Sequence, residues 1–223
     1  MLATTNSGKL RELKRILADA GLDVVTLDLA GFAEPQTDKD IETGSTFAEN
    51  ALLKARYYHK LSSMPTIGDD SGLEVDALSG APGIYSARYA GPGASDRDRV
   101  DKLLGEISTV EQARRGARFV CAAAFVWDRG ERVFIGEARG RLLDHPRGGG
   151  GFGYDPIFYY EPLGKTFAEL TEEEKRVVGH RGRAFRQLTG WLNESRLLDT
   201  LSPSDKIKNP AEDHSASSSR GDL

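Results

Sequence analysis

The sequence predicts an α/β fold built around a mixed β-sheet. Short apolar segments that suit strands alternate with segments whose apolar residues recur at helical spacing. Two long segments, 117–127 and 132–139, are joined by a polar turn, which is typical of an antiparallel hairpin and makes the sheet mixed. A chain of 223 residues is also long enough to bury a substantial core.

The composition is that of a soluble, mildly acidic protein. Hydrophobic residues make up 39% of the chain, charged residues 29%, and the formal net charge is −4. Because there is no basic excess, we expect no nucleic-acid partner. The longest apolar stretch without a charge, Phe119–Trp127, falls far short of the roughly 20 residues of a membrane helix, and we expect no signal peptide at the start. We therefore expect a cytoplasmic protein without a membrane partner, with its one cysteine, Cys121, as a buried structural thiol.

The chain opens with a strand that turns into a helix. Met1–Thr4 suits the strand, and Gly21 ends a helix with one apolar face, made of Leu10, Leu13, Leu17 and Ala20. Asn6–Lys9 therefore lies where free backbone N–H groups and the helix dipole favour an anion, and Lys9 adds a positive charge. A plain helix cap by Asn6 or Ser7 explains the same residues, so both interpretations stay open.

A second strand, Asp23–Leu27, and an irregular polar loop lead to a second helix. Thr46 and Glu49 form a capping box at its start. The helix runs to about His59, and its expected buried side consists of Phe47, Ala51, Ala55 and Tyr58.

Two adjacent carboxylates, Asp69 and Asp70, lie within the glycine-flanked segment Gly68–Gly72. We expect a buried strand at Met64–Ile67 to end at this pair, and a new strand to begin at Leu73–Val75. Neighbouring ionised carboxylates repel each other unless a positive group lies beside them, and a hard divalent cation is the usual one. A turn formed by Asp, Ser and Gly is an equally good explanation of the segment alone.

Three residues before this pair are candidates to face it. Asn50 and Lys54 are one helical turn apart and suit the same cleft. Glu42 lies in the loop before the helix and could join the two aspartates if that loop folds over them.

Two further stretches complete the middle of the chain. Gly80–Tyr89 is rich in glycine and proline and predicts a loop, in which Arg88 lies between two tyrosines. Ser95 and Asp98 then cap a helix whose core-facing residues are Val100, Leu103, Leu104 and Ile107.

The glycine-rich segment Gly148–Phe158 differs from a plain linker because it continues into aromatic residues, an aspartate and a proline. Phe152 lies between glycines, and we expect an exposed ring with room on both sides for stacking on a nucleobase. Asp155 is placed to accept a hydrogen bond from a ring N–H of that base.

The last ordered elements are helical. Thr171 and Glu174 form a capping box, and a glycine break at 179–182 precedes a second apolar face of Phe185, Leu188 and Leu192. Lys175, His180 and Arg181 are either plain surface charges or part of a binding site beside the segment Gly148–Phe158. We expect one domain over 1–198 and a disordered polar tail over 199–223.

Taken together, these motifs resemble the inosine/xanthosine triphosphate pyrophosphatase family over residues 1–197. The segments that carry the resemblance occur in the family's order: Thr4–Lys9, Glu42–Ala51, Asp69–Leu73, Gly80–Arg88, Gly151–Phe158 and His180–Gly182. Two departures are Gly179, where the family often has serine, and a start that is a few residues shorter than usual.

The resemblance implies an elongated mixed sheet flanked by helices, with two lobes around a central nucleotide-binding cleft, in a homodimer. It implies Mg²⁺-dependent hydrolysis of ITP, dITP or XTP to the monophosphate and pyrophosphate, which removes deaminated purines from the nucleotide pool. Asp70 matches the proposed proton acceptor, and Glu42 and Asp70 match the metal-associated acids, with Asp69 as a further candidate. The matching substrate-binding positions are Thr4, Thr5, Asn6, Ser7, Gly8, Lys9, Ser71, Phe152, Gly153, Tyr154, Asp155, Lys175, His180 and Arg181.

The chemistry of these residue types agrees with that reaction. Mg²⁺ with Lys9 and Lys54 would neutralise a triphosphate, and Mg²⁺ commonly uses few carboxylates besides substrate phosphates. Lysine and arginine only donate hydrogen bonds, so they suit the 6-keto group of hypoxanthine or xanthine and oppose the 6-amino group of adenine. Two alternatives stay open, namely a pyrophosphatase for pyrimidine or modified bases and a non-catalytic nucleotide sensor.

Overall fold

The computed structural model describes residues 1–32 and 41–197, and these form a mixed α/β fold around one β-sheet. Within them the sheet has six strands in the order β1-β2-β3-β4-β5-β6. The strands are Leu2–Ala3, Thr66–Val75, Gly116–Trp127, Gly130–Leu142, Phe158–Tyr160 and Lys165–Thr166. β1 pairs with β2 in parallel and every other pair is antiparallel, which confirms the predicted mixed sheet.

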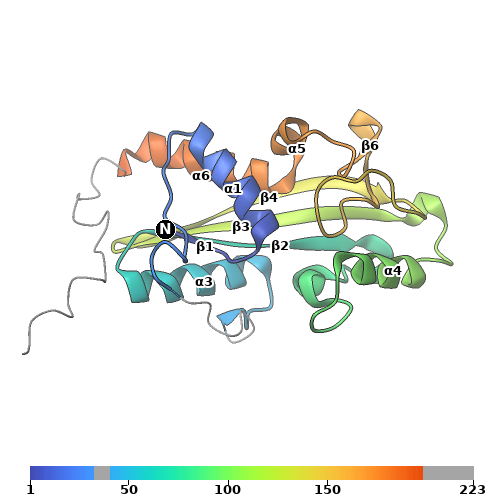
Figure 1. Ribbon diagram of the computed structural model, residues 1–223, viewed down its shortest axis with the longest axis horizontal. Coiled ribbons are helices and arrows are strands. Elements are labelled where there is room, and N and C mark those ends of the chain that lie inside the picture. Colours follow the sequence, from blue (N-terminus) through green and yellow to red (C-terminus); the bar gives the residue numbers. More distant parts are fainter. Residues whose placement is uncertain (33–40, 198–223) are drawn as a thin grey trace, which may run out of the picture.

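Helices cover both faces of the sheet, while the long strands β3 and β4 extend through most of its length (Figure 1). α1, α5 and α6 lie over one face, and α3 and α4 lie over the other (Figure 1). In chain order the α-helices are α1 Ser7–Asp19, α3 Phe47–Ser62, α4 Asp96–Glu106, α5 Glu172–Val178 and α6 His180–Ser195. Short 3₁₀ helices span Asp76–Leu78, Gly83–Arg88, Gln112–Arg114 and Glu161–Leu163. None of the described helices has the length and apolarity to traverse a lipid bilayer.

Local capping explains where most helices begin. The Asn6 side chain accepts a hydrogen bond from the Lys9 backbone N–H, which confirms the helix-cap interpretation of that turn. The capping boxes predicted at the starts of α4 and α5 are both present. At α3 the prediction was half right, because Thr46 caps the helix but Glu49 accepts its hydrogen bonds from Ser45.

The alternation of side chains along β2 separates the two adjacent aspartates. Successive residues of a strand point to opposite faces of the sheet. Ile67 packs in the apolar cluster beneath α1 and α6, and Asp69 lies on that same face. Gly68 lies against the backbone of α3, so Asp70 is on the α3 face. The sheet therefore places one carboxylate in each of two different environments.

Several predicted boundaries were wrong. Asp23–Leu27 forms no strand, and Thr26 alone makes an isolated bridge to Leu2. β2 runs without interruption through the acidic pair, because all ten of its residues pair with β3, so the pair is neither a strand end nor a turn. The predicted loop at 80–89 is largely 3₁₀ helix.

Other expectations were confirmed or stay open. The predicted buried residues of α3 are buried, as is Cys121. On the predicted apolar face of α1, Leu13 and Leu17 are buried, but Leu10 and Ala20 are only half-buried. The polar loop around 33–40 and the expected tail at 199–223 lie outside the described residues. The domain boundary and the arrangement in two lobes remain predictions.

Candidate active site

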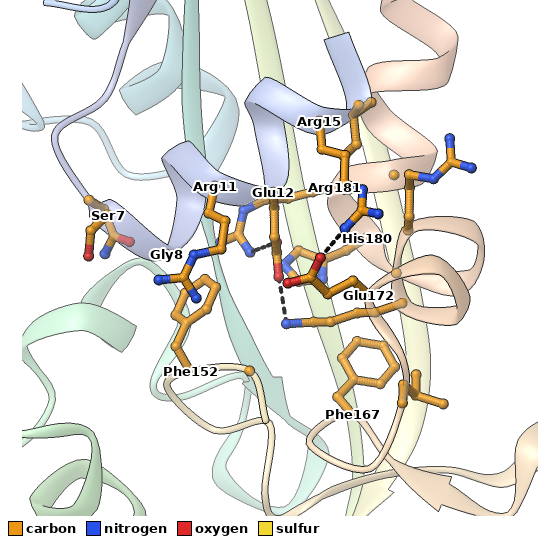
Figure 2. A pocket seen from close by; sticks show the side chains of 18 of the residues that line it. Ser7, Gly8, Arg11, Glu12, Arg15, Phe152, Phe167, Glu172, His180 and Arg181 are labelled. Carbon is orange, nitrogen blue, oxygen red and sulfur yellow. Dashed lines mark hydrogen bonds and ion pairs between the residues drawn. The ribbon is translucent and has the colours of Figure 1, made fainter. Parts of the chain in front are cut away.

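A cavity of about 350 Å³ opens between the start of α1, the loop 148–153 and the helices α5 and α6 (Figure 2). Its volume is at the lower end of the range for small-molecule sites, about 300–1,000 Å³. The lining includes these residues predicted as substrate-binding: Asn6, Ser7, Gly8, Phe152, Lys175, His180 and Arg181. Segments that are distant in sequence thus converge as the resemblance implied.

A carboxylate that sequence reasoning missed lies at the centre of this cavity. Glu12 of α1 forms ion pairs with Lys175, at 2.6 Å, and with Arg181, at 2.8 Å (Figure 2). Burial alone would raise the pKa of Glu12, but the charges of Arg181 and Lys175 outweigh it and lower that pKa. Glu12 therefore stays ionised and holds the two cations side by side.

Arg181 links the cavity to the sheet. Its Nη2 donates to Ser71 Oγ at 2.7 Å, and its Nε lies 3.8 Å from Asp69 Oδ2. Burial would lower the pKa of Arg181, but Glu12 and Asp69 raise it instead. Ser71 and Arg181 were each predicted as substrate-binding and are in direct contact, and Arg181 is buried rather than a surface charge.

Asp69 is the buried counter-ion of Lys9 and Arg181, which we call the cationic cluster. The side chain is fully buried, with Oδ1 at 2.6 Å from Lys9 Nζ and Oδ2 accepting the Cys121 thiol at 3.1 Å. Burial would raise its pKa, but Lys9 and Arg181 outweigh it, and the pKa falls to about 2. Because protein groups occupy both oxygens, the geometry gives no support to Asp69 as a metal ligand.

Asp70 lies on the opposite face in a different environment. It is 7% exposed, and its Oδ1 accepts the Ser71 backbone N–H at 2.9 Å. Burial, reinforced by the negative charge of Glu42, raises the pKa of Asp70 to about 6 despite Lys9 and Lys54. A carboxylate with a pKa near neutrality is suited to take up a proton during a reaction.

Glu42 and Lys54 complete this second environment. Their side chains form an ion pair, and Lys54 Nζ also donates to the Asp69 carbonyl oxygen at 3.2 Å. The predicted approach of Glu42 to the acidic pair is therefore observed. The nearby negative charge of Glu42 acts on Asp70 and raises its pKa. Among the described residues no three His, Cys, Asp or Glu side chains form a metal-binding cluster.

Phe152 does not have the free space that the sequence suggested. Its ring lies against Gly8, where an added Cβ would come within 2.8–2.9 Å of the ring atoms. Lys175 Nζ and Arg181 lie 4.9 and 5.1 Å from the ring centroid. The ring therefore forms one wall of the cavity, in contact with α1 and facing two cations.

His180 is fully buried and neutral. It stacks on Phe119, with ring centroids 4.7 Å apart. Burial, with the charges of Arg181 and Lys175 as further causes, lowers its pKa well below the usual value. Its Nδ1 has no hydrogen-bond partner among the described residues, so one polar atom stays available beside the cavity.

Other residues predicted as substrate-binding do not line the cavity. Asp155 is buried and accepts hydrogen bonds from the Phe152 backbone N–H and Lys175, and Tyr154 donates to the Ser86 carbonyl. Thr4, Thr5 and Gly153 are likewise absent from the cavity lining. Lining residues that the sequence did not reveal are Arg11, Glu12, Arg15, Ile16, Asp96, Phe167, Leu170, Glu172 and Arg176.

Three comparisons with known proteins point to the same family. The profile of the Ham1 family matches residues 1–191. A dITP/XTP pyrophosphatase of Yersinia pseudotuberculosis is 50% identical over 198 residues, which cover 87% of this chain and 98% of that protein. One from Streptomyces avermitilis is 50% identical over 196 residues, 87% of this chain and 96% of that protein. A solved HAM1 protein from Coxiella burnetii is 39% identical, with a TM-score of 0.77 over 86% of this chain and 97% of that one.

Proposed function

The chain belongs to the Ham1 family, and on that basis we propose that it hydrolyses deaminated purine nucleoside triphosphates, namely ITP, dITP and XTP. The products are the nucleoside monophosphate and pyrophosphate. Relatives that are 50% identical are named dITP/XTP pyrophosphatases. The observation that carries the proposal is the cavity in which Lys175 and Arg181 face the Phe152 ring beside the start of α1.

The cavity suits the base of such a nucleotide. Lys175 and Arg181 can only donate hydrogen bonds, so they favour a 6-keto oxygen over the 6-amino group of adenine. A mismatch of buried polar groups can discriminate by about 10⁴ or more. The planar wall formed by Phe152 offers a surface for base stacking.

The start of α1 suits the triphosphate. Asn6, Ser7 and Gly8 all line the cavity at the N-terminus of a 13-residue helix, where backbone N–H groups and the helix dipole favour an anion. Lys9 adds its charge on the side of the acidic pair, at 2.6 Å from Asp69. The phosphates therefore extend from the cavity towards Asp70 in our proposal.

Glu42 and Asp70 are the residues that would hold Mg²⁺. They lie on the same side of β2 near Lys54, and Asp70 Oδ2 is buried with no hydrogen-bond partner among the described residues. This donor set fits, since Mg²⁺ commonly takes one or two carboxylates plus substrate phosphates. When bound, the ion would neutralise charge on the phosphates and the departing pyrophosphate.

Asp70 is the proposed general base. In our proposal its carboxylate accepts a proton from the water that attacks the α-phosphorus; in the metal-free protein burial already raises the pKa of Asp70 to about 6. The proposal also includes a homodimer, as the resemblance to the family implies, and a cytoplasmic location, as expected from the sequence.

Product analysis tests the proposal. Purified protein with Mg²⁺ is given ITP, XTP, GTP and ATP in parallel, and the products are separated by ion-exchange chromatography. We expect IMP or XMP plus pyrophosphate, little product from ATP or GTP, and no turnover in EDTA. Formation of a diphosphate plus phosphate would place the attack at another phosphorus and refute the mechanism. No turnover of any purine would favour a pyrimidine pyrophosphatase or a nucleotide sensor.

A further inference from the structure

We propose that Asp96, the first residue of α4, is a positioning residue for the nucleobase. It acts by fixing the loop 148–153, which carries Phe152 and which we call the aromatic loop. This inference rests on the proposed function, because it concerns how that substrate is held.

The loop cannot fix the Phe152 ring by its own backbone. Gly148, Gly151 and Gly153 all have positive φ, between 63° and 83°. Glycine populates this region as readily as negative φ, so such a segment has many alternative conformations when it is not held. The position of the ring therefore depends on contacts from outside the glycines.

Two carboxylates supply those contacts to successive backbone N–H groups. Asp155 Oδ2 accepts the Phe152 N–H at 2.8 Å, and Asp96 Oδ2 accepts the Gly153 N–H at 2.7 Å. Asp155 lies in the same segment as Phe152, and Lys175 donates a hydrogen bond to it. Asp96 is 57 residues earlier in the chain, so its hydrogen bond ties the aromatic loop to a separate helix.

Asp96 is itself held in place. Its Oδ1 is ion-paired with Arg99, and the Arg99 guanidinium also donates to the carbonyl oxygens of Ala87 and Ala94. Hydrogen bonds to a charged acceptor are stronger than those between neutral groups. The anchor is therefore a fixed carboxylate on a helix of 11 residues.

Asp96 borders the cavity, but both of its oxygens are already occupied. Its effect on the substrate is therefore indirect. Loss of the Gly153 contact would release the loop, and the Phe152 ring would lose its fixed position against Gly8. Base binding would weaken, while the chemistry at Asp70, on another part of the sheet, would continue.

Steady-state kinetics with ITP test this inference. We expect Asp96→Ala to raise KM about tenfold or more, as for the loss of one hydrogen bond to a charged group, with kcat nearly unchanged. Asp101→Ala, on the same helix and exposed, is the matched control and should leave both constants unchanged. Turnover by the wild type and by this control in the same assay tests the proposed function separately.

A double-mutant cycle separates positioning from general destabilisation. If Asp96 acts through the aromatic loop, Asp96→Ala should change KM little when Phe152→Ala is already present. Additive effects of the two substitutions would show an independent structural role and refute the inference. An unchanged KM in the single variant Asp96→Ala would refute it as well.

Discussion

Replacement of Asp70 by asparagine should stabilise the metal-free protein, and the gain should grow with pH. Burial raises the pKa of Asp70 from 3.8 to about 6, so the folded state binds the proton more tightly than the unfolded state. Above pH 6 the ionised carboxylate therefore opposes folding, and this penalty disappears as pH falls towards 4. The asparagine side chain of the variant would carry no charge at any pH.

The magnitude follows from the two pKa values. A shift of about two units corresponds to about 3 kcal/mol of lost stability at pH 8. At pH 5 the same relation leaves about 1.6 kcal/mol, so the difference between variant and wild type should be about 1.4 kcal/mol larger at pH 8 than at pH 5. This change between pH 5 and pH 8 tests the reasoning better than either single value, because the packing effects of the new amide are the same at both pH values.

Urea unfolding in EDTA at several pH values would measure this difference in stability between the variant and the wild type. The same Asp70→Asn protein should fail to hydrolyse ITP when Mg²⁺ is supplied, although it is folded. A stability difference that does not change between pH 5 and pH 8 would show that Asp70 is not a raised-pKa group. Near-normal turnover would remove it from the mechanism.

Neighbouring contacts give three further predictions. Asp69→Asn should destabilise the protein by about 3–5 kcal/mol at pH 7, because Lys9 and Arg181 lose a buried counter-ion. The wild type should lose about 2.5 kcal/mol as pH falls from 5 through 2, because the pKa of Asp69 is lowered from 3.8 to about 2. Urea unfolding that shows no loss of stability for the variant at pH 7 would contradict this assignment. Gly8→Ala should raise KM for ITP by displacing the Phe152 ring, while the Tm stays level or rises because alanine favours helix; an unchanged KM would disprove the contact. Phe152→Ala should cost about 1–3 kcal/mol of base binding, measured as a higher KM with little change in kcat, and equal losses in both would argue against stacking.

Features set by local chemistry could be predicted from the sequence. The caps at Asn6, Thr46, Ser95 and Thr171 mark the starts of four helices, because a side-chain acceptor near the chain's own N–H groups needs no distant partner. The hairpin of β3 and β4 was also predictable, since its strands are adjacent in the chain and joined by a short turn.

Features set by distant contacts could not be predicted in this way. Gly68, Asp69, Asp70 and Ser71 have low strand propensity, yet pairing along β3 makes them the middle of β2. Conversely, Asp23–Leu27 has the composition of a strand but lacks a continuous pairing partner.

The same limit applies to the site. Lys175, His180 and Arg181 were expected at the substrate because of the resemblance, and the structure brings them to one cavity. Glu12 and Asp96 gave no local signal, since each belongs to the polar surface of its own helix. Their partners in the site come from the packing of α1 against α5 and α6, and of α4 beside the loop 148–153.

The placement of Asp69 and Asp70 on opposite faces of β2 also has a consequence for folding and for engineering. A slip of β2 by one residue against β3 would exchange the faces of every side chain in the strand. Asp70 would then enter the cationic cluster, Asp69 would face α3, and Ile67 and Leu73 would leave their apolar clusters. The misaligned strand would thus lose ion pairing and apolar burial together, so the acidic doublet specifies a single alignment. A one-residue insertion or deletion within β2 should for this reason be far less tolerated than a substitution at the same place.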